Sequence, residues 1–150
     1  MTMCAAIPQQ IRDLEQLLQA TNQFTNNWLQ YAQQALMAAT AAGHVNVLVS
    51  SGQLIPTLAK LMLYGLSPFF SVDCIYNSAH KFKPYCFEEV AKRFAPIGAV
   101  RYVAIGDGDE ERLAADGLNL QFGRPLVSFH QIDKPDDLAA LARKIAARAI

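Results

Sequence analysis

The 150-residue sequence predicts an α/β fold in which a mainly parallel sheet is flanked by helices. After Gly43, short apolar runs alternate with segments of helical periodicity, an order typical of parallel strands joined by helices. Before Gly43 the periodicity is helical throughout. Hydrophobic residues make up 52% of the chain, enough for a core that excludes water. We therefore expect a helical segment at 1–43 and an α/β core at 44–150, treated as one domain.

The helical segment contains two apolar stripes, which predict two helices between Ile11 and Ala42. The break between them lies at 21–23 or at 25–27, because both clusters offer short polar side chains that can cap the second helix. Gly43 is expected to end that helix.

The first strand of the core is predicted at Val45–Val49, which is short, β-branched and almost wholly apolar. Such a run is typical of a strand covered on both faces. A helix at 53–66 completes the first strand–helix unit, with Pro56 near its first turn. The remaining elements are expected as strands at 73–78, 100–105 and 125–129, and as helices at 84–94, 109–116 and 135–149.

Charge and cysteine usage narrow the function classes. Lys and Arg total 13, as do Asp and Glu, so no overall field attracts nucleic acid or an anionic membrane. The apolar stretches are shorter than the roughly 20 residues that a membrane span needs, and the first ten residues do not resemble a signal peptide. The 3 cysteines have irregular spacing, which predicts reduced thiols. We expect an intracellular protein of the cytoplasm, the nucleus or both.

Polar residues that follow the predicted strands are the candidates for a ligand site, because ligands of parallel sheets gather at the carboxyl ends of strands. Ser50 and Ser51 can donate hydroxyl hydrogen bonds to a phosphoryl oxygen, or they can cap the following helix. Lys83 precedes Pro84 at a helix start, where its ammonium can pair with an anion or remain a solvated surface group.

The run from Gly106 to Glu111 combines two glycines with four acids at a strand end. Crowded carboxylates favour a bound cation, and Mg²⁺ is the expected one. The alternative is an acidic helix start in which Asp107 or Asp109 caps the helix, while Glu110 and Glu111 interact favourably with its dipole. The residues alone leave both interpretations open.

Several runs occur together along the chain, and their combination is more specific than any one of them. They are Asn46–Lys60 (NVLVSSGQLIPTLAK), Leu63–Leu66 (LYGL), Ile75-Tyr76, Lys83, Cys86–Glu88 (CFE), Ile105–Gly108 (IGDG) and Glu110-Glu111, with Leu14-Glu15 and Trp28-Leu29 upstream. Over roughly 14–124 the sequence resembles the C-terminal, larger part of the Eyes absent phosphatase domain, a haloacid-dehalogenase-type fold. The resemblance implies a three-layer core, with residues 1–43 as a remnant of the family's helical insertion.

The resemblance also implies a magnesium-dependent protein tyrosine phosphatase that forms an aspartyl-phosphate. Ser50, or its neighbour Ser51, would bind the phosphoryl group, and Lys83 would neutralise charge on the nucleophile and the phosphate. Asp107 would hold Mg²⁺, supported by Glu111. Serine stands at position 50 where the animal family has threonine, which conserves the hydroxyl.

The nucleophile is the main departure from the family pattern. The family's Asp-x-Asp strand precedes the helical insertion, and Asp13 is the only aspartate before Gly43 in this sequence. We therefore expect a truncated chain that is inactive alone, with a gap between the strands near Val45 and Val100. A phosphotyrosine protein is the expected substrate. The alternatives are an interaction module, related to Eyes absent transcriptional coactivators, that binds a homeodomain transcription factor, and an unrelated α/β phosphate-binding domain.

Overall fold

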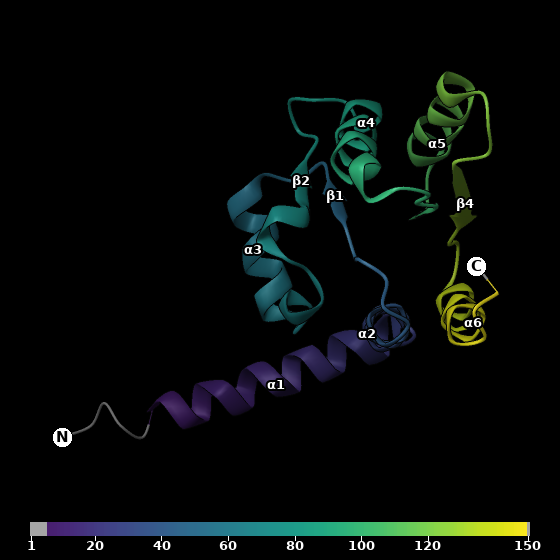
Figure 1. Cartoon of the computed structure of the whole chain (residues 1–150). Coiled ribbons are helices and arrows are strands. Elements are labelled where there is room, and N and C mark those ends of the chain that lie inside the picture. Colours follow the sequence, from purple (N-terminus) through teal and green to yellow (C-terminus); the bar gives the residue numbers. More distant parts are fainter. Residues whose placement is uncertain (1–5, 150) are drawn as a thin grey trace.

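The computed structural model describes residues 6–149, which form a mixed α/β structure (Figure 1). The helices are α1 Ala6–Phe24, α2 Trp28–Ala41, α3 Leu54–Leu63, α4 Lys83–Phe94, α5 Asp109–Phe122 and α6 Pro135–Ala146. The strands are β1 Leu48–Ser50, β2 Ile75–Asn77, β3 Tyr102–Gly106 and β4 Val127–Gln131. Short 3-10 helices lie at Ser67–Phe69, Val72–Cys74 and Ala95–Ile97. The α/β prediction is confirmed at this level, with each predicted helix and strand present.

The break between α1 and α2 lies at residues 25–27, the second of the two predicted positions. Asn26 and Asn27 both adopt the left-handed backbone conformation, with φ of 54° and 64°. The expected cap by this cluster is wrong, because Asn27 makes no side-chain cap bond. Asn22, at the end of α1, instead accepts the backbone amide of Gln30 at 3.3 Å. Gly43 follows the end of α2 with φ of 80°, as expected of a helix-terminating glycine.

The strands pair in parallel but form two separate sheets, β1 with β2 and β3 with β4. The β3–β4 register joins five residue pairs from Tyr102↔Val127 to Gly106↔Gln131, whereas β1–β2 joins three. Within residues 6–149, β1 and β3 do not pair with each other. The gap expected between these two strands is therefore not closed by direct pairing.

The prediction for the first strand is wrong in its extent and its burial. The strand begins at Leu48 rather than Val45, and the Val45 side chain is 62% exposed. All three residues of β1 are only half-buried. A sheet of two short strands leaves part of each face open, so this apolar run is not covered as a central strand would be.

Two hydrophobic cores hold the molecule together. One joins α2 to α6 through Ala35, Ala39, Leu141 and Ile145. The other joins α4 and α5 to the β3–β4 sheet, with Ala115 and five other buried residues at its centre. Because α2 packs on α6, the predicted helical segment 1–43 shares a core with the last helix of the chain.

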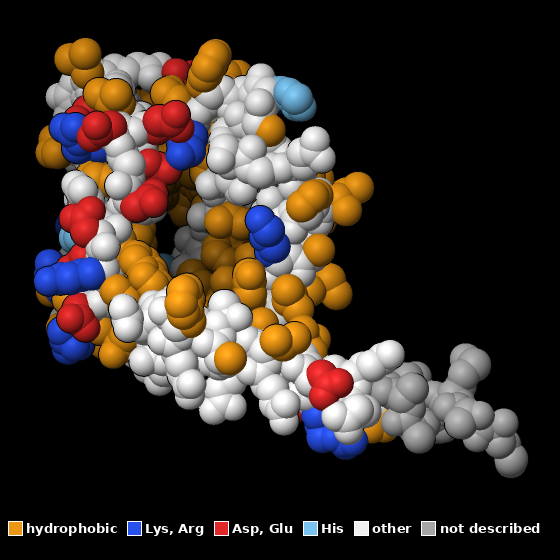
Figure 2. Space-filling model, turned by 180° about the vertical axis from the view of Figure 1, so that it is seen from behind, with side chains coloured by type: hydrophobic (Ala, Val, Ile, Leu, Met, Phe, Trp, Pro, Cys, Tyr) orange, Lys and Arg blue, Asp and Glu red, His pale blue; other side chains and the backbone are white. Residues whose placement is uncertain are grey.

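Between these cores the surface is hollowed. Figure 2 shows a hollow in the middle of one face, with hydrophobic side chains along its walls. On β3, Val103 and Ile105 are 39% and 46% exposed, while Ala104 between them is buried. One face of the β3–β4 sheet therefore lacks the cover that α5 gives to the other.

Two further sequence predictions concern cysteines and membrane spans. Cys74 and Cys86 are free and buried, in agreement with reduced thiols, and Cys4 lies outside the described residues. In the described part of the chain, no helix combines the length and the hydropathy that a membrane span requires.

Candidate active site

The predicted site residues lie where the strands end. Ser50 is the last residue of β1, Lys83 begins α4 after the loop that follows β2, and Asp107 follows β3. Parallel strands bring their carboxyl ends to one edge of a sheet. Two polar clusters form there, one around Lys83 and one around Ser50.

The first cluster joins the starts of α4 and α5. The Lys83 ammonium donates to Glu111 Oε1 at 2.5 Å and lies 3.1 Å from Glu110 Oε2. The side chains of Lys83 and Glu111 are 17% and 16% exposed, whereas Glu110 is 75% exposed. Lys83 is thus a nearly buried cation bound by acids 27 and 28 residues away in the sequence, not a solvated surface lysine.

Glu111 packs closely against the glycine loop that precedes α5. A Cβ atom on Gly106 would lie 2.7 Å from Glu111 Cγ, and one on Gly108 would lie 3.0 Å from Glu111 Oε2. The two glycines therefore leave room for the carboxylate. Its Oε2 is buried and has no hydrogen-bond partner among the described residues.

The acidic start of α5 is confirmed, since Asp109, Glu110 and Glu111 occupy its first turn. The expected capping is wrong, because Gly108 is the N-cap and neither Asp107 nor Asp109 supplies a side-chain cap bond. Asp109 pairs instead with Arg112 at 2.5 Å.

The ion pair shifts both titrations. Burial by itself lowers the pKa of Lys83, but hydrogen bonds and charge from Glu111 and Glu110 outweigh it, so the pKa lies above its ordinary value. Burial alone raises the pKa of Glu111, but the hydrogen bond and charge of Lys83, with the nearby backbone N–H dipoles of Gly108 and Glu111, bring it below its ordinary value. The pair is therefore fully charged at neutral pH.

The residues present do not fit Mg²⁺ by themselves. No group of three His, Cys, Asp or Glu side chains converges anywhere in residues 6–149. Asp107 is exposed, and Glu111 Oε1 is already bound by Lys83. Glu111 Oε2 is a buried carboxylate oxygen without a partner in the described part of the chain, but Mg²⁺ needs near-octahedral oxygen coordination.

The second cluster surrounds Ser50. Its Oγ accepts the backbone amide of Gly52 at 3.1 Å and lies 3.3 Å from Thr57 Oγ1. Thr57 donates its own hydroxyl proton to the Gln53 carbonyl, so Ser50 is the donor in the 3.3 Å contact. Because that bond is long, the Ser50 hydroxyl can turn to another acceptor at small cost.

The expected capping of α3 by Ser50 or Ser51 is wrong. Gln53 is the N-cap, and it makes no side-chain cap bond. Ser51 is exposed, and no hydrogen bond from its side chain is present in the described part of the chain. Ser50 is therefore the better of the two candidates for contact with a phosphoryl group.

Sequence reasoning missed Asn77, which ties the Ser50 loop to the loop that leads to Lys83. Its Nδ2 donates to the Gly52 carbonyl at 2.9 Å, and its Oδ1 accepts the Ala79 amide at 2.7 Å. A polar residue at the end of a predicted strand was the available signal. No hydrogen bond or ion pair joins Ser50 to Lys83 or Asp107 within residues 8–149, so the two clusters remain distinct.

Comparisons with known proteins place these residues in a family, although no family model matches the chain. Human protein phosphatase EYA3 is 38% identical over 130 residues, which cover 83% of this chain and 22% of the human protein. Protein phosphatase eya of Drosophila melanogaster is 44% identical over 108 residues, covering 71% of this chain and 13% of that protein.

Protein phosphatase EYA3 of Gallus gallus, a shorter sequence, is 35% identical over 88 residues, which cover 58% of this chain and 74% of the relative. Of the human and Drosophila proteins, by contrast, the chain spans less than a quarter. The similarity to relatives from vertebrates and an insect bears out the resemblance seen in the sequence. The chain belongs to the Eyes absent protein phosphatase family.

Proposed function

We propose that this chain forms the phosphate-binding part of a haloacid-dehalogenase-type protein tyrosine phosphatase of the Eyes absent family. In this proposal Ser50 donates to the phosphoryl group of a phosphotyrosine protein, and Lys83 neutralises charge on the phosphate and on an aspartate nucleophile. Asp107 and Glu111 would be the chain's contribution to a magnesium site that further carboxylates complete. Mg²⁺ would supply charge neutralisation at the transferring phosphoryl group.

The Lys83–Glu111 pair is the observation that supports the proposal most. A nearly buried ammonium at the carboxyl ends of the strands is suited to a phosphoryl group, because low exposure strengthens its interaction with an anion. Glu111 balances the charge of Lys83 while no anion is bound. In this proposal a phosphate replaces Glu110 at the ammonium, because the Glu110 side chain is 75% exposed and can turn into solvent.

The nucleophile is the part that the 150 residues do not supply in the family's arrangement. The only Asp-x-Asp in the sequence is Asp107-Gly108-Asp109, which belongs to the acidic loop before α5. We propose that an aspartate strand completes the sheet between β1 and β3. The lack of pairing between those strands and the exposed side chains of Val103 and Ile105 support this position.

The proposal predicts that the 150-residue chain alone does not hydrolyse an aryl phosphate with Mg²⁺. The test is a p-nitrophenyl phosphate assay on the purified chain and on Asp107→Asn. Turnover by the parent chain that disappears in Asp107→Asn would show that the chain carries its own catalytic centre. That result would overturn the proposal that these 150 residues lack the nucleophile.

A second assay tests the function itself. The chain is fused behind the segment that directly precedes the matched region in human protein phosphatase EYA3. We expect magnesium-dependent hydrolysis by this fusion, and its loss in Lys83→Met and Ser50→Ala. A fusion that unfolds cooperatively yet remains inactive would count against a phosphatase role for these residues.

An interaction module is the second candidate function, and α1 is the feature that favours it. Leu17 and Phe24 on this helix are 65% and 89% exposed, and Ile11 is 52% exposed. Exposed apolar side chains in one region favour a protein partner, and a homeodomain transcription factor is the one we propose. Titration of the chain with such a protein should show binding that Leu17→Ser with Phe24→Ser weakens, while Met62→Ser on α3 serves as a matched control. Equal binding by all three forms would exclude α1 as the contact.

A further inference from the structure

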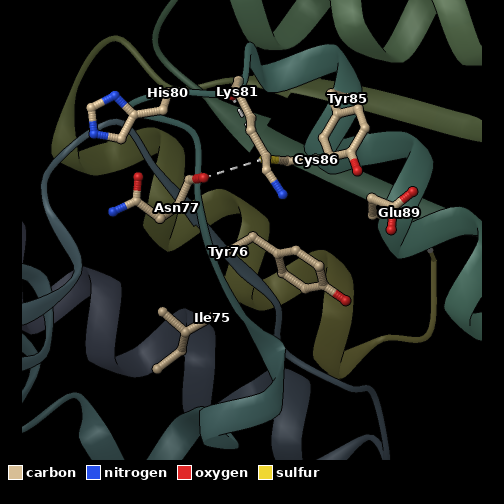
Figure 3. Close-up of a pocket in the computed structure, with 8 residues that line it drawn as sticks. All are labelled: Ile75, Tyr76, Asn77, His80, Lys81, Tyr85, Cys86 and Glu89. Atoms are coloured by element: carbon tan, nitrogen blue, oxygen red, sulfur yellow. Dashed lines mark hydrogen bonds between the residues drawn. The ribbon is translucent and has the colours of Figure 1, made fainter.

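A groove of about 400 Å³ lies beside β2 (Figure 3). Its walls come from β2, the loop that follows it, and α4. The polar and aromatic residues that line it are Tyr76, Asn77, His80, Lys81, Tyr85 and Glu89, with Cys86 and Ile75 completing the surface. A volume of this size is within the usual range for small-molecule sites, roughly 300–1,000 Å³.

The uncompensated charge in this groove is positive. Lys81 has no carboxylate within 4.0 Å among residues 8–149, and its ammonium lies 5.0 Å from the centroid of the Tyr85 ring. The one acid of the groove, Glu89, is paired with Lys92 at 3.1 Å. An anion that enters the groove would therefore meet an available cation, and the nearest acid is already neutralised.

The walls are suited to an aromatic ring. Figure 3 shows the Lys81 side chain extending between the rings of Tyr85 and Tyr76. Cys86 is 2% exposed, and its thiol donates to the Asn77 carbonyl at 3.8 Å, so it presents little polar surface to the groove. Burial raises the pKa of this thiol, which agrees with an apolar floor of the groove.

We propose that this groove binds an aromatic carboxylate. The exposed Lys81 side chain turns away from the Tyr85 ring to pair with the carboxylate, and the ligand's ring takes its place between Tyr76 and Tyr85. A single lysine balances one negative charge, so a carboxylate matches it better than a phosphate dianion does. The ring contacts the tyrosine faces, where offset stacking is favourable. Lys83, Ser50 and Asp107 do not line the groove, so its proposed ligand is distinct from the proposed phosphatase substrate. Asn77, which does line it, also holds the Ser50 loop through the Gly52 carbonyl.

Three probes separate the contributions of charge and ring. Naphthalene-2-carboxylate carries both, naphthalene-2-carboxamide lacks the charge, and acetate lacks the ring. Each is titrated into the ¹⁵N-labelled full chain, and amide shifts are followed by NMR. We expect the naphthoate to shift the backbone amide signals of residues 75–89. The carboxamide probe and acetate should each bind at least about tenfold more weakly than the naphthoate.

Variants then test the named contacts. Lys81→Met and Tyr85→Ala should each weaken naphthoate binding by about tenfold. Both side chains are exposed, so the fold should tolerate these changes. Lys60→Met, an exposed lysine on α3, is the matched charge control, and Ser50→Ala reports on the candidate active site; both should bind as the parent does.

Four results would overturn the proposal. The first three are equal binding of the naphthoate and its amide, unchanged affinity in Lys81→Met, and shifts that centre on residues 50–57 or 106–111 in place of the groove. Loss of binding in Ser50→Ala would likewise assign the probe to the candidate active site. None of these results depends on catalysis, so they leave the phosphatase assays to be judged separately.

Discussion

The two small sheets of this protein are built differently, although each pairs two parallel strands. The β3–β4 sheet is covered by α5 and packed on buried side chains that include Ala104, Leu118 and Val127. The β1–β2 sheet has only half-buried residues in both strands. The β3–β4 sheet therefore has its own hydrophobic core, whereas the β1–β2 sheet depends more on hydrogen bonds between its loops.

Each sheet also has one asparagine that bridges backbone groups. Asn119 on α5 donates to the Val127 carbonyl at 2.8 Å and accepts the amides of Leu126 and Val127 at 2.7 and 2.8 Å. Asn77 makes two such bonds, and both are exposed to solvent. The same side chain thus stabilises a partly buried contact in one sheet and an exposed loop contact in the other.

The largest predicted effect comes from the core of the β3–β4 sheet. Leu118 is 4% exposed, so Leu118→Ala should lower the free energy of unfolding by about 2–5 kcal/mol through lost burial and the cavity left behind. Leu48→Ala, the matched change in half-buried β1, should cost clearly less. Urea unfolding followed by circular dichroism measures both, and equal losses would contradict the difference between the sheets.

The two asparagines give the next effect. Asn119→Ala should destabilise the chain by about 2–3 kcal/mol, because it removes three partly buried hydrogen bonds. Asn77→Ala should cost less than about 1 kcal/mol, since water can replace its two exposed bonds. The same urea measurement applies, and a larger loss for Asn77→Ala would reverse the comparison.

Lys83 tests the polar contact between the starts of α4 and α5. Lys83→Met should cost about 1–2 kcal/mol, because Glu111 would be left nearly buried without its partner. The matched change, Lys92→Met, breaks only exposed pairs with Glu88 and Glu89 and should change stability little. Thermal unfolding at low and high salt would compare them. A similar response of both lysines to salt would indicate that the Lys83 pair is also solvated.

Much of this architecture is readable in the sequence because it depends on local signals. Gly43 ends a helix as its backbone freedom predicts, and Pro135 begins the last helix. The family runs place Ser50 and Asp107 after strands and Lys83 at a helix start, where the structure has them.

The remainder depends on tertiary contacts that periodicity does not encode. Val45 is β-branched and apolar but exposed, because no neighbouring element covers it. Asn22 rather than Asn27 accepts the amide of Gln30, because the left-handed turn at Asn26 and Asn27 changes the direction of the chain. The Lys83–Glu111 pair joins residues 28 apart, and only the packing of α4 on α5 brings them together.

The smallest predicted effect is the pH dependence of that pair, and its sign follows from the two pKa shifts. The folded-state pKa of Glu111 is below its ordinary value of 4.5, so its stabilising contribution is complete above pH 4.5 and is lost as the pH falls through the folded pKa. The pKa of Lys83 is raised above 10.5, so its contribution is complete below that value and is lost only in strong alkali. Between these limits the pair should contribute a constant amount.

Glu111→Gln tests the loss of stability at low pH that is due to the Glu111 carboxylate, because glutamine can still accept a hydrogen bond from Lys83 but does not titrate. The difference in unfolding free energy between parent and variant should be constant from pH 8 to pH 5.5 and should shrink between about pH 4.5 and pH 3 as the parent's carboxylate is protonated. Glu88→Gln, at an exposed pair with Lys92 on α4, is the control, and its difference in unfolding free energy from the parent should change less with pH. If the Glu111→Gln difference instead stays constant down to pH 3, the carboxylate of Glu111 is not stabilised by Lys83, and the contact between α4 and α5 contributes through packing alone.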